Sequence, residues 1–169
     1  VTQGLASFPG VPGRMERVIG SNKKPTPTVF VDYAHKPEAL EKVLHSVRAA
    51  CKGRVIVVFG CGGDRDRLKR PKMGDIASRL ADLVFVTSDN SRSEKPESIM
   101  EEILNGILHS DRPKVTLEVD RAKAIAAAIK AASPSDIVVI AGKGHEKYQI
   151  FSNRTIPFDD VEVAQTALN

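Results

Sequence analysis

Short apolar runs that give way to polar or glycine-rich stretches recur along the chain. The run Leu83 to Val86 leads, after two small polar residues, into Asp89-Asn90-Ser91-Arg92. An apolar run without polar alternation is typical of a strand that is buried on both faces of a parallel sheet. The predicted strands are 15–19, 28–33, 54–59, 83–86, 114–119, 136–141, 148–151 and 154–158.

Between these strands, apolar residues recur at the spacing of one helix face. Leu40, Leu44 and Val47 follow Pro37, which suits a first helical position. The predicted helices run from 37 to the glycine at 53, from 71 to 81, from 96 to 108, from 120 to 132 and from 159 onward. This alternation predicts an α/β fold with a Rossmann-like, mostly parallel, doubly wound sheet and helices on both faces.

Turn residues dominate the first part of the chain, where Pro9, Gly10, Pro12 and Gly13 cluster. We interpret residues 1–27 as a lead-in and residues 28–169 as one domain. A length of 169 residues is enough for a domain with a proper core. The first residue is Val1 rather than Met, which is typical of a piece of a longer chain.

The charge balance excludes some partners and favours others. The formal net charge is +4, but aromatic residues make up only 5% of the chain and the basic residues are scattered. Nucleic-acid binding requires a dense basic stripe with aromatic side chains, so small anionic partners are favoured. No apolar run approaches the ~20 residues that span a bilayer, and no signal pattern opens the chain. With only two cysteines, the sequence predicts a protein of the reducing cytoplasm with no membrane partner.

The loops that follow parallel strands meet at one edge of the sheet, where open α/β sheets bind ligands. Here those loops are polar or glycine-rich: 32–35, 60–66, 89–92 and 142–146. An Arg beside an Asp can pair with a carboxylate and an ammonium at once. We therefore expect the corner of Asp89 and Arg92 to bind a zwitterionic amino acid.

Each loop also has a plainer interpretation. Asp32 and His35 could be capping or turn residues, and the glycines of 60–63 could only turn the chain. Residues 64–66 could be a solvated charge cluster, and Arg92 could form a surface ion pair with Glu94. These alternatives stay open at the level of single motifs.

Several kinds of chemistry lack their sequence pattern. Gly142-Lys143-Gly144 has neither the glycine spacing nor the hydroxyl residue of a Walker A loop, and no Gly-x-Gly-x-x-Gly supports a dinucleotide oxidoreductase. No cluster has the spacing of metal ligands, so we predict no resident metal site. No arrangement indicates a covalent nucleophile, and Cys61 is interpreted as structural.

Taken together, the loops resemble the carboxyl-terminal part of the Mur ligases. The motifs that carry the resemblance cover nearly the whole chain and best match the members that add the third residue of the peptidoglycan stem peptide. They are Gly13-Arg14-Met15-Glu16, Asp32-Tyr33-Ala34-His35, Gly60-Cys61-Gly62-Gly63-Asp64-Arg65-Asp66, Asp89-Asn90-Ser91-Arg92 and Gly142-Lys143-Gly144-His145-Glu146.

The resemblance implies ATP-dependent amide formation, in which a carboxylate of UDP-MurNAc-L-Ala-D-Glu becomes an acyl phosphate that the incoming amine attacks. It makes residues 1–27 an interdomain hinge and residues 28–169 the carboxyl-terminal amino-acid-binding domain. It places Arg14 and Asp32 at ATP, with His35 near the nucleotide. The implied amino-acid pocket consists of Arg65, Asp89, Asn90, Ser91, Arg92, Gly142 and Glu146. The phosphate loop and the modified lysine of the family belong to a central domain that has no match here, so ligands of the Mg²⁺ that accompanies ATP are expected mainly outside this chain.

The family members that use meso-diaminopimelate carry Asp-Asn-Pro-Arg where this chain has Ser91 in place of Pro. Their Arg holds the far carboxylate of the ligand, and lysine-adding members generally lack it. Because Arg92 is kept, the resemblance favours meso-diaminopimelate. The alternatives are a lysine-adding member, another ligase of the superfamily such as folylpolyglutamate synthase, or a ligand-binding module without catalysis. We expect the 169-residue chain to fold but not to catalyse by itself.

Overall fold

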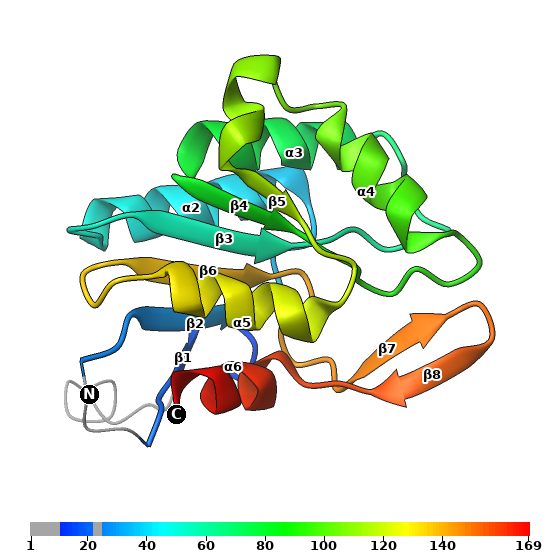
Figure 1. Cartoon of the computed structure of the whole chain (residues 1–169). Coiled ribbons are helices and arrows are strands. Elements are labelled where there is room, and N and C mark those ends of the chain that lie inside the picture. The colour runs from blue at the N-terminus through cyan, green and yellow to red at the C-terminus, as the bar shows by residue number, and fades with distance from the viewer. Residues whose placement is uncertain (1–10, 22–24) are drawn as a thin grey trace, which may run out of the picture.

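The computed structural model describes residues 11–21 and 25–169. Its centre is a six-stranded sheet with the order β1-β2-β6-β3-β4-β5, in which only β1 is antiparallel to its neighbour (Figure 1). The predicted mostly parallel sheet is therefore confirmed. Its strands are β1 Glu16–Val18, β2 Thr28–Asp32, β3 Val55–Phe59, β4 Leu83–Val86, β5 Val115–Leu117 and β6 Ile137–Ala141.

Helices cover both faces of this sheet (Figure 1). Along β3, Val57 and Phe59 pack into the core beneath α2, α3 and α4, whereas Ile56 and Val58 pack into the core beneath α5 and α6. Each face thus has its own apolar layer, as the doubly wound interpretation requires. The helices are α2 Pro37–Ala50, α3 Lys69–Leu80, α4 Pro96–Leu104, α5 Arg121–Ala131 and α6 Asp160–Leu168, with a 3-10 helix η1 at His109–Lys114.

Helix ends depart from the sequence prediction where packing decides them. Helix α3 begins two residues before Pro71, which is tolerated because the first turn needs no donor there. Helix α4 ends at Leu104 instead of 108. Gly106 then passes so close to α3 that a Cβ would lie 1.8 Å from the Pro71 carbonyl oxygen. The 3-10 helix that follows was not predicted.

A hairpin of β7 Tyr148–Phe151 and β8 Arg154–Pro157 projects from the body of the fold (Figure 1). Backbone bonds tie it to the loop after β4, because the Arg92 amide donates to the Ile150 carbonyl at 3.1 Å. The predicted pair of short strands is confirmed, and its attachment places it beside the polar edge of the sheet.

The lead-in joins the sheet as far as it is described. Glu16 of β1 lies opposite Val31 of β2, and Gly13 packs so tightly on the loop after β6 that a Cβ would lie 2.2 Å from the His145 amide nitrogen. Residues 1–10 and 22–24 of the expected hinge lie outside the described residues, and the boundary at 28 stays a prediction. Both cysteines are free thiols. In the described ranges, no helix has the length and apolar character needed to traverse a bilayer.

Candidate functional site

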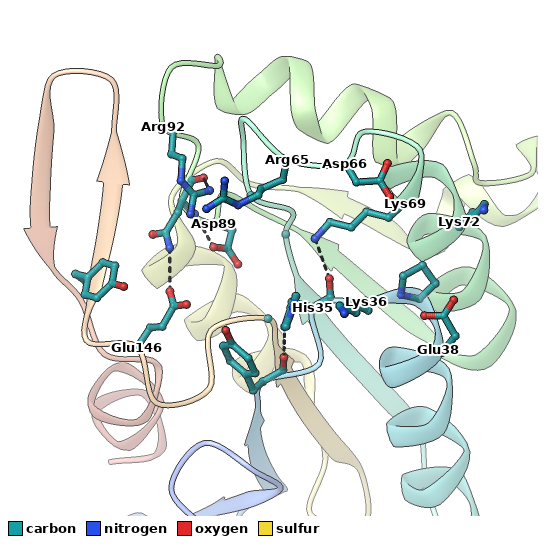
Figure 2. A pocket seen from close by; sticks show the side chains of 17 residues that line it. His35, Lys36, Glu38, Arg65, Asp66, Lys69, Lys72, Asp89, Arg92 and Glu146 are labelled. Carbon is teal, nitrogen blue, oxygen red and sulfur yellow. Dashed lines mark hydrogen bonds between the residues drawn. The ribbon is translucent and has the colours of Figure 1, made fainter.

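A pocket of about 710 Å³ opens at the carboxyl edge of the sheet, where the loops after β3, β4 and β6 meet the first turns of α2 and α3 (Figure 2). Most of the residues proposed from the sequence line it together. They are His35, Arg65, Asp89, Asn90, Arg92, Gly142 and Glu146. The polar loops therefore form one cavity, as the strand pattern predicts.

Arg92 is held in an unusual backbone conformation, with φ at +51°. Its Nη1 donates to the carbonyl of Gly63 at 2.8 Å and to that of Asn90 at 3.3 Å. These two bonds fix one side of the guanidinium, and within the described residues its other nitrogens donate to no protein group. Arg92 thus presents donors to the pocket from a fixed position. The alternative of an Arg92–Glu94 ion pair is wrong, because Glu94 pairs elsewhere.

Asn90 links three elements through its side chain. Its Nδ2 donates to Glu146 at 2.8 Å, and its Oδ1 accepts from the Ile150 amide at 3.0 Å and from Lys143 Nζ at 3.1 Å. The side-chain amide of Asn90 therefore joins the loop 89–92, the loop after β6 and the hairpin. The ammonium of Lys143 was not among the predicted site residues, although its position between two glycines marked it as belonging to the motif.

Gly142 has a positive φ of +114°, which an L side chain rarely adopts. A Cβ there would also lie 2.9 Å from a carboxylate oxygen of Asp89. The glycine therefore keeps room for the Asp89 carboxylate at the wall of the pocket.

Ser91 does not line the pocket, in contrast to its neighbours in the motif. Its side chain is only 1% exposed, and Oγ has no hydrogen-bond partner in the part of the chain that the structure describes. Its carbonyl accepts from the Glu94 amide at 3.0 Å and lies against Gly63, where a Cβ would approach to 1.9 Å. The sequence placed Ser91 correctly in the loop, but its hydroxyl does not face the cavity.

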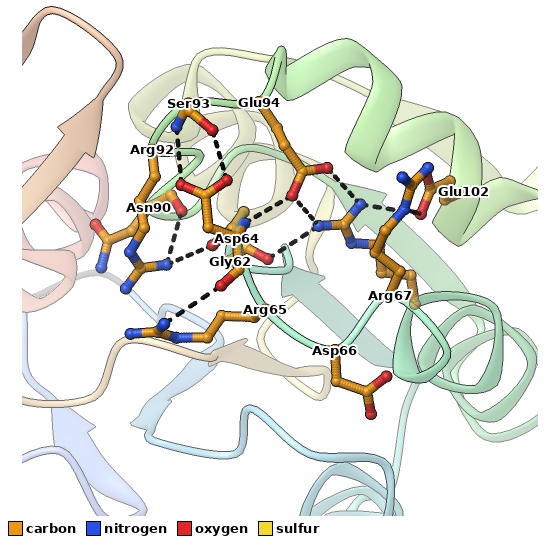
Figure 3. Close-up of polar contacts among 12 residues, drawn as sticks. Gly62, Asp64, Arg65, Asp66, Arg67, Asn90, Arg92, Ser93, Glu94 and Glu102 are labelled. Carbon is orange, nitrogen blue, oxygen red and sulfur yellow. Dashed lines mark hydrogen bonds and ion pairs between the residues drawn. The ribbon is translucent and has the colours of Figure 1, made fainter.

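A buried guanidinium supports the glycine-rich loop that carries Arg65; Figure 3 shows Gly62, Asp64 and Arg65 of this loop near Glu94. Arg70, with 0% of its side chain exposed, pairs with Glu94 at 2.7 Å and with Glu102 at 2.9 Å, and donates to the Gly62 carbonyl at 3.3 Å. Glu94 also accepts from the Asp64 amide at 2.7 Å. Hydrogen bonds from Arg70 lower the pKa of Glu94 to about 2. This cluster holds the loop, so that Arg65 extends over the pocket.

A second buried pair lies behind the pocket. Arg121 and Asp160 are both fully buried and join at 2.8 Å, while Arg121 also donates to the carbonyls of Ser88 at 3.3 Å and Ala141 at 3.0 Å. Ala141 is the last residue of β6, and Ser88 lies two residues beyond β4. The pair therefore fixes the backbone just before the polar loops 89–92 and 142–146. Neither residue was recognised from the sequence.

The residues expected near ATP form a separate group beside the pocket. Asp32 is 5% exposed, and its two oxygens accept from the amides of Met15 and Ala34, each at 2.8 Å. It therefore braces a turn rather than capping α2. The exposed guanidinium of Arg14 lies 4.8 Å from the centre of the Tyr33 ring, and His35 Nδ1 lies 2.9 Å from the Tyr33 carbonyl oxygen. Of the three predicted residues, only His35 lines the pocket.

Comparison with known proteins identifies the family. Residues 13–144 match the family model described as Mur ligase, glutamate ligase domain. The chain belongs to the Mur ligase family. The resemblance drawn from the five motifs is thereby confirmed for this Mur ligase domain.

Among its relatives, the UDP-N-acetylmuramoyl-L-alanyl-D-glutamate–2,6-diaminopimelate ligase of Prochlorococcus marinus subsp. pastoris is 54% identical over 167 residues, 97% of this chain and 32% of that protein. A solved structure of a ligase with the same name has a TM-score of 0.85 at 40% identity and covers 98% of this chain. The chain spans about a third of the length of these relatives.

A bifunctional folylpolyglutamate synthase/dihydrofolate synthase from Yersinia pestis, complexed with AMPPNP and Mn, shares the fold, with a TM-score of 0.61 at 22% identity over 85% of this chain and 31% of that chain. Within the described residues of the Mur ligase domain, no group of three or more His, Cys, Asp or Glu could hold a metal ion. Of the three residues expected near ATP, Arg14 is exposed and His35 is partly exposed, whereas Asp32 is buried.

Proposed function

We propose that this chain is the carboxyl-terminal domain of an ATP-dependent ligase that adds meso-diaminopimelate to UDP-MurNAc-L-Ala-D-Glu in peptidoglycan synthesis. In this proposal the pocket binds the incoming amino acid, and the group around Arg14 completes the ATP site. The remaining parts of the active site lie in other domains, as the one-third coverage of the relatives suggests.

The observation that carries the proposal is the chemistry of the pocket wall. Two guanidiniums, from Arg65 and Arg92, and two carboxylates, from Asp89 and Glu146, line one end of the cavity. Meso-diaminopimelate carries two carboxylates and two ammonium groups, so each of its charges finds an opposite partner type there. Lysine lacks the second carboxylate and would leave Arg92 without an anion, which is unfavourable for a partly buried charge.

The reaction assigns distinct tasks to the residues of this chain. ATP supplies the phosphoryl group that activates the acceptor carboxylate. Arg92 and Asp89 orient the far end of the amino acid, which leaves its other amine free to attack the activated carbonyl. Arg14 provides a guanidinium for phosphate oxygens, and Asp32, whose oxygens already accept two amides, keeps lone pairs for ribose hydroxyls. We propose cytoplasmic catalysis, in keeping with ATP as a substrate and with two free thiols.

The experiment is calorimetric titration of the full-length ligase, in the presence of a non-hydrolysable ATP analogue, with meso-diaminopimelate and separately with L-lysine. The proposal expects saturable binding of diaminopimelate and binding of lysine that is weaker by orders of magnitude. Tighter binding of lysine would make the enzyme a lysine-adding ligase. Binding of neither amino acid would remove the amino-acid pocket from the proposal.

A further inference from the structure

Lys143 places an ammonium directly behind the charged end of the pocket. Its side chain is 0% exposed, and it does not line the cavity. Nζ lies 3.2 Å from a carboxylate oxygen of Glu146, 3.1 Å from Asn90 Oδ1 and 3.9 Å from a carboxylate oxygen of Asp89. Both carboxylates of the pocket end therefore already have a cation beside them before any ligand arrives.

This ammonium offsets part of the negative charge at the pocket end. It pairs with Glu146 and lies near Asp89, and both of these carboxylates line the pocket. Lys143 therefore lowers the attraction that the two carboxylates exert on an arriving cation. It does not contact Arg92, whose remaining donors stay available for a carboxylate.

We propose that Lys143 is a specificity-determining residue that makes this end of the pocket select a ligand with a far carboxylate and reject one whose far end is only an ammonium. The inference rests on the proposed function and deepens it. Specificity often depends on a repulsive element as well as an attractive one. Arg92 attracts the carboxylate, and Lys143 weakens the attraction of Asp89 and Glu146 for an ammonium that arrives alone.

A purely structural role would not require this charge. Asn90 Oδ1 and Glu146 need a hydrogen-bond donor, which a neutral amide side chain also provides. A buried ammonium is costly unless carboxylates pair with it, and its carboxylate partners here are the two that line the pocket. The substitution Lys143→Gln therefore separates the two roles, because it keeps a donor and removes the charge.

The test measures competition in the full-length ligase between two probes that differ only at the far end. L-2-Aminopimelate keeps the far carboxylate and lacks the far amine, whereas L-lysine keeps the far amine and lacks the carboxylate. In the unmodified enzyme aminopimelate is expected to bind more tightly than lysine. In Lys143→Gln and in Lys143→Met this preference should fall about tenfold or more, as buried charge couplings across an interface do. Lys143→Arg, which keeps the positive charge, should keep the preference for aminopimelate.

The matched control is Lys130→Met, which removes one positive charge from an exposed position of α5 and should leave the preference unchanged. An unchanged preference in folded Lys143→Gln overturns the inference. A preference for lysine over aminopimelate in the unmodified enzyme also overturns it, because Lys143 would then not weaken the binding of a lone far ammonium. If neither the two probes nor meso-diaminopimelate bind, the proposed function itself is overturned.

Discussion

Two arginines at the same edge of the sheet differ in what surrounds them. The guanidinium of Arg121 is fully buried, and its nitrogens donate to both oxygens of Asp160 and to the carbonyls of Ser88 and Ala141. Arg92 lines the pocket and, within the described residues, donates only through Nη1, to two loop carbonyls. Arg121 thus has all its partners inside the protein, whereas Arg92 is held in place and still has donors that no protein group accepts within the described residues.

Different arginines therefore hold the loops in place and face the pocket. Arg121, like Arg70 on the other face, fixes backbone carbonyls from which the binding loops extend. The hydrogen bonds of Arg92 to the protein fix its position, and its remaining donors are left for the amino acid that we propose as the ligand. Substitutions of the two residues should therefore separate stability from ligand affinity.

The largest expected effect is on folding. Arg121→Met leaves the Asp160 carboxylate buried without a cation, and breaking a buried pair in this way costs about 3–5 kcal/mol. Urea denaturation of the domain should show this loss in the free energy of unfolding. Arg79→Met is the control, because its pair with Asp75 is exposed and such pairs contribute at most about 1 kcal/mol. Equal effects of the two substitutions would contradict the supporting role of Arg121.

The next effect is on ligand binding. Arg92→Ala in the full-length ligase removes the partner of the far carboxylate, which should weaken binding by about 2–5 kcal/mol and raise the Michaelis constant for diaminopimelate by orders of magnitude. The free energy of unfolding should change little, since the guanidinium bonds only to loop carbonyls. An unchanged Michaelis constant would remove Arg92 from the pocket.

A smaller effect depends on pH. The pKa of Glu94 falls from its usual 4.5 to about 2, chiefly because Arg70 donates hydrogen bonds to it. Because the pKa is lower in the folded state, this stabilisation is present above about pH 4.5 and is lost as the pH falls towards 2. Between pH 6 and pH 3, the free energy of unfolding should therefore decrease less steeply in Glu94→Gln than in the unmodified protein. At pH 6 it should already be lower in the variant. Glu97→Gln, at an exposed position of α4, should follow the unmodified curve.

The smallest effect is at Ser91. Its buried Oγ has no partner in the described residues, and an unsatisfied buried hydroxyl is unfavourable. Ser91→Ala should therefore raise the free energy of unfolding by up to about 1 kcal/mol and leave diaminopimelate binding intact. A loss of binding would mean that the hydroxyl contacts the ligand after all.

The sequence predicted the elements whose signals are local. The buried strands β3, β4 and β6 are continuous apolar runs, and Asp120 accepts from the amides of Ala122 and Lys123 as an expected helix cap does. The convergence of the polar loops followed from strand direction alone. Ends of helices were predicted less well, because α4 ends where Gly106 meets Pro71 of another helix, and no local signal records that contact.

The supporting charges were missed for a related reason. Arg121 belongs to an alanine-rich helix, and its partner Asp160 lies 39 residues further along the chain. A charged residue is usually exposed, so its burial becomes predictable only when the distant partner is known. Lys143 and Glu146 were visible within one motif, but the second carboxylate near Lys143, that of Asp89, comes from a loop that only the folded chain brings close.

The hairpin of β7 and β8 has a further consequence. Arg92 and Phe151 form a parallel bridge, and the amide of Ile150 donates to Asn90, 60 residues away in the chain. Opening of the hairpin must therefore break hydrogen bonds of the loop 89–92, which we propose to bind the amino acid. Amide hydrogens at Arg92 and Ile150 should exchange with deuterated solvent more slowly when the pocket is filled, so that the projecting hairpin acts as a built-in reporter of occupancy.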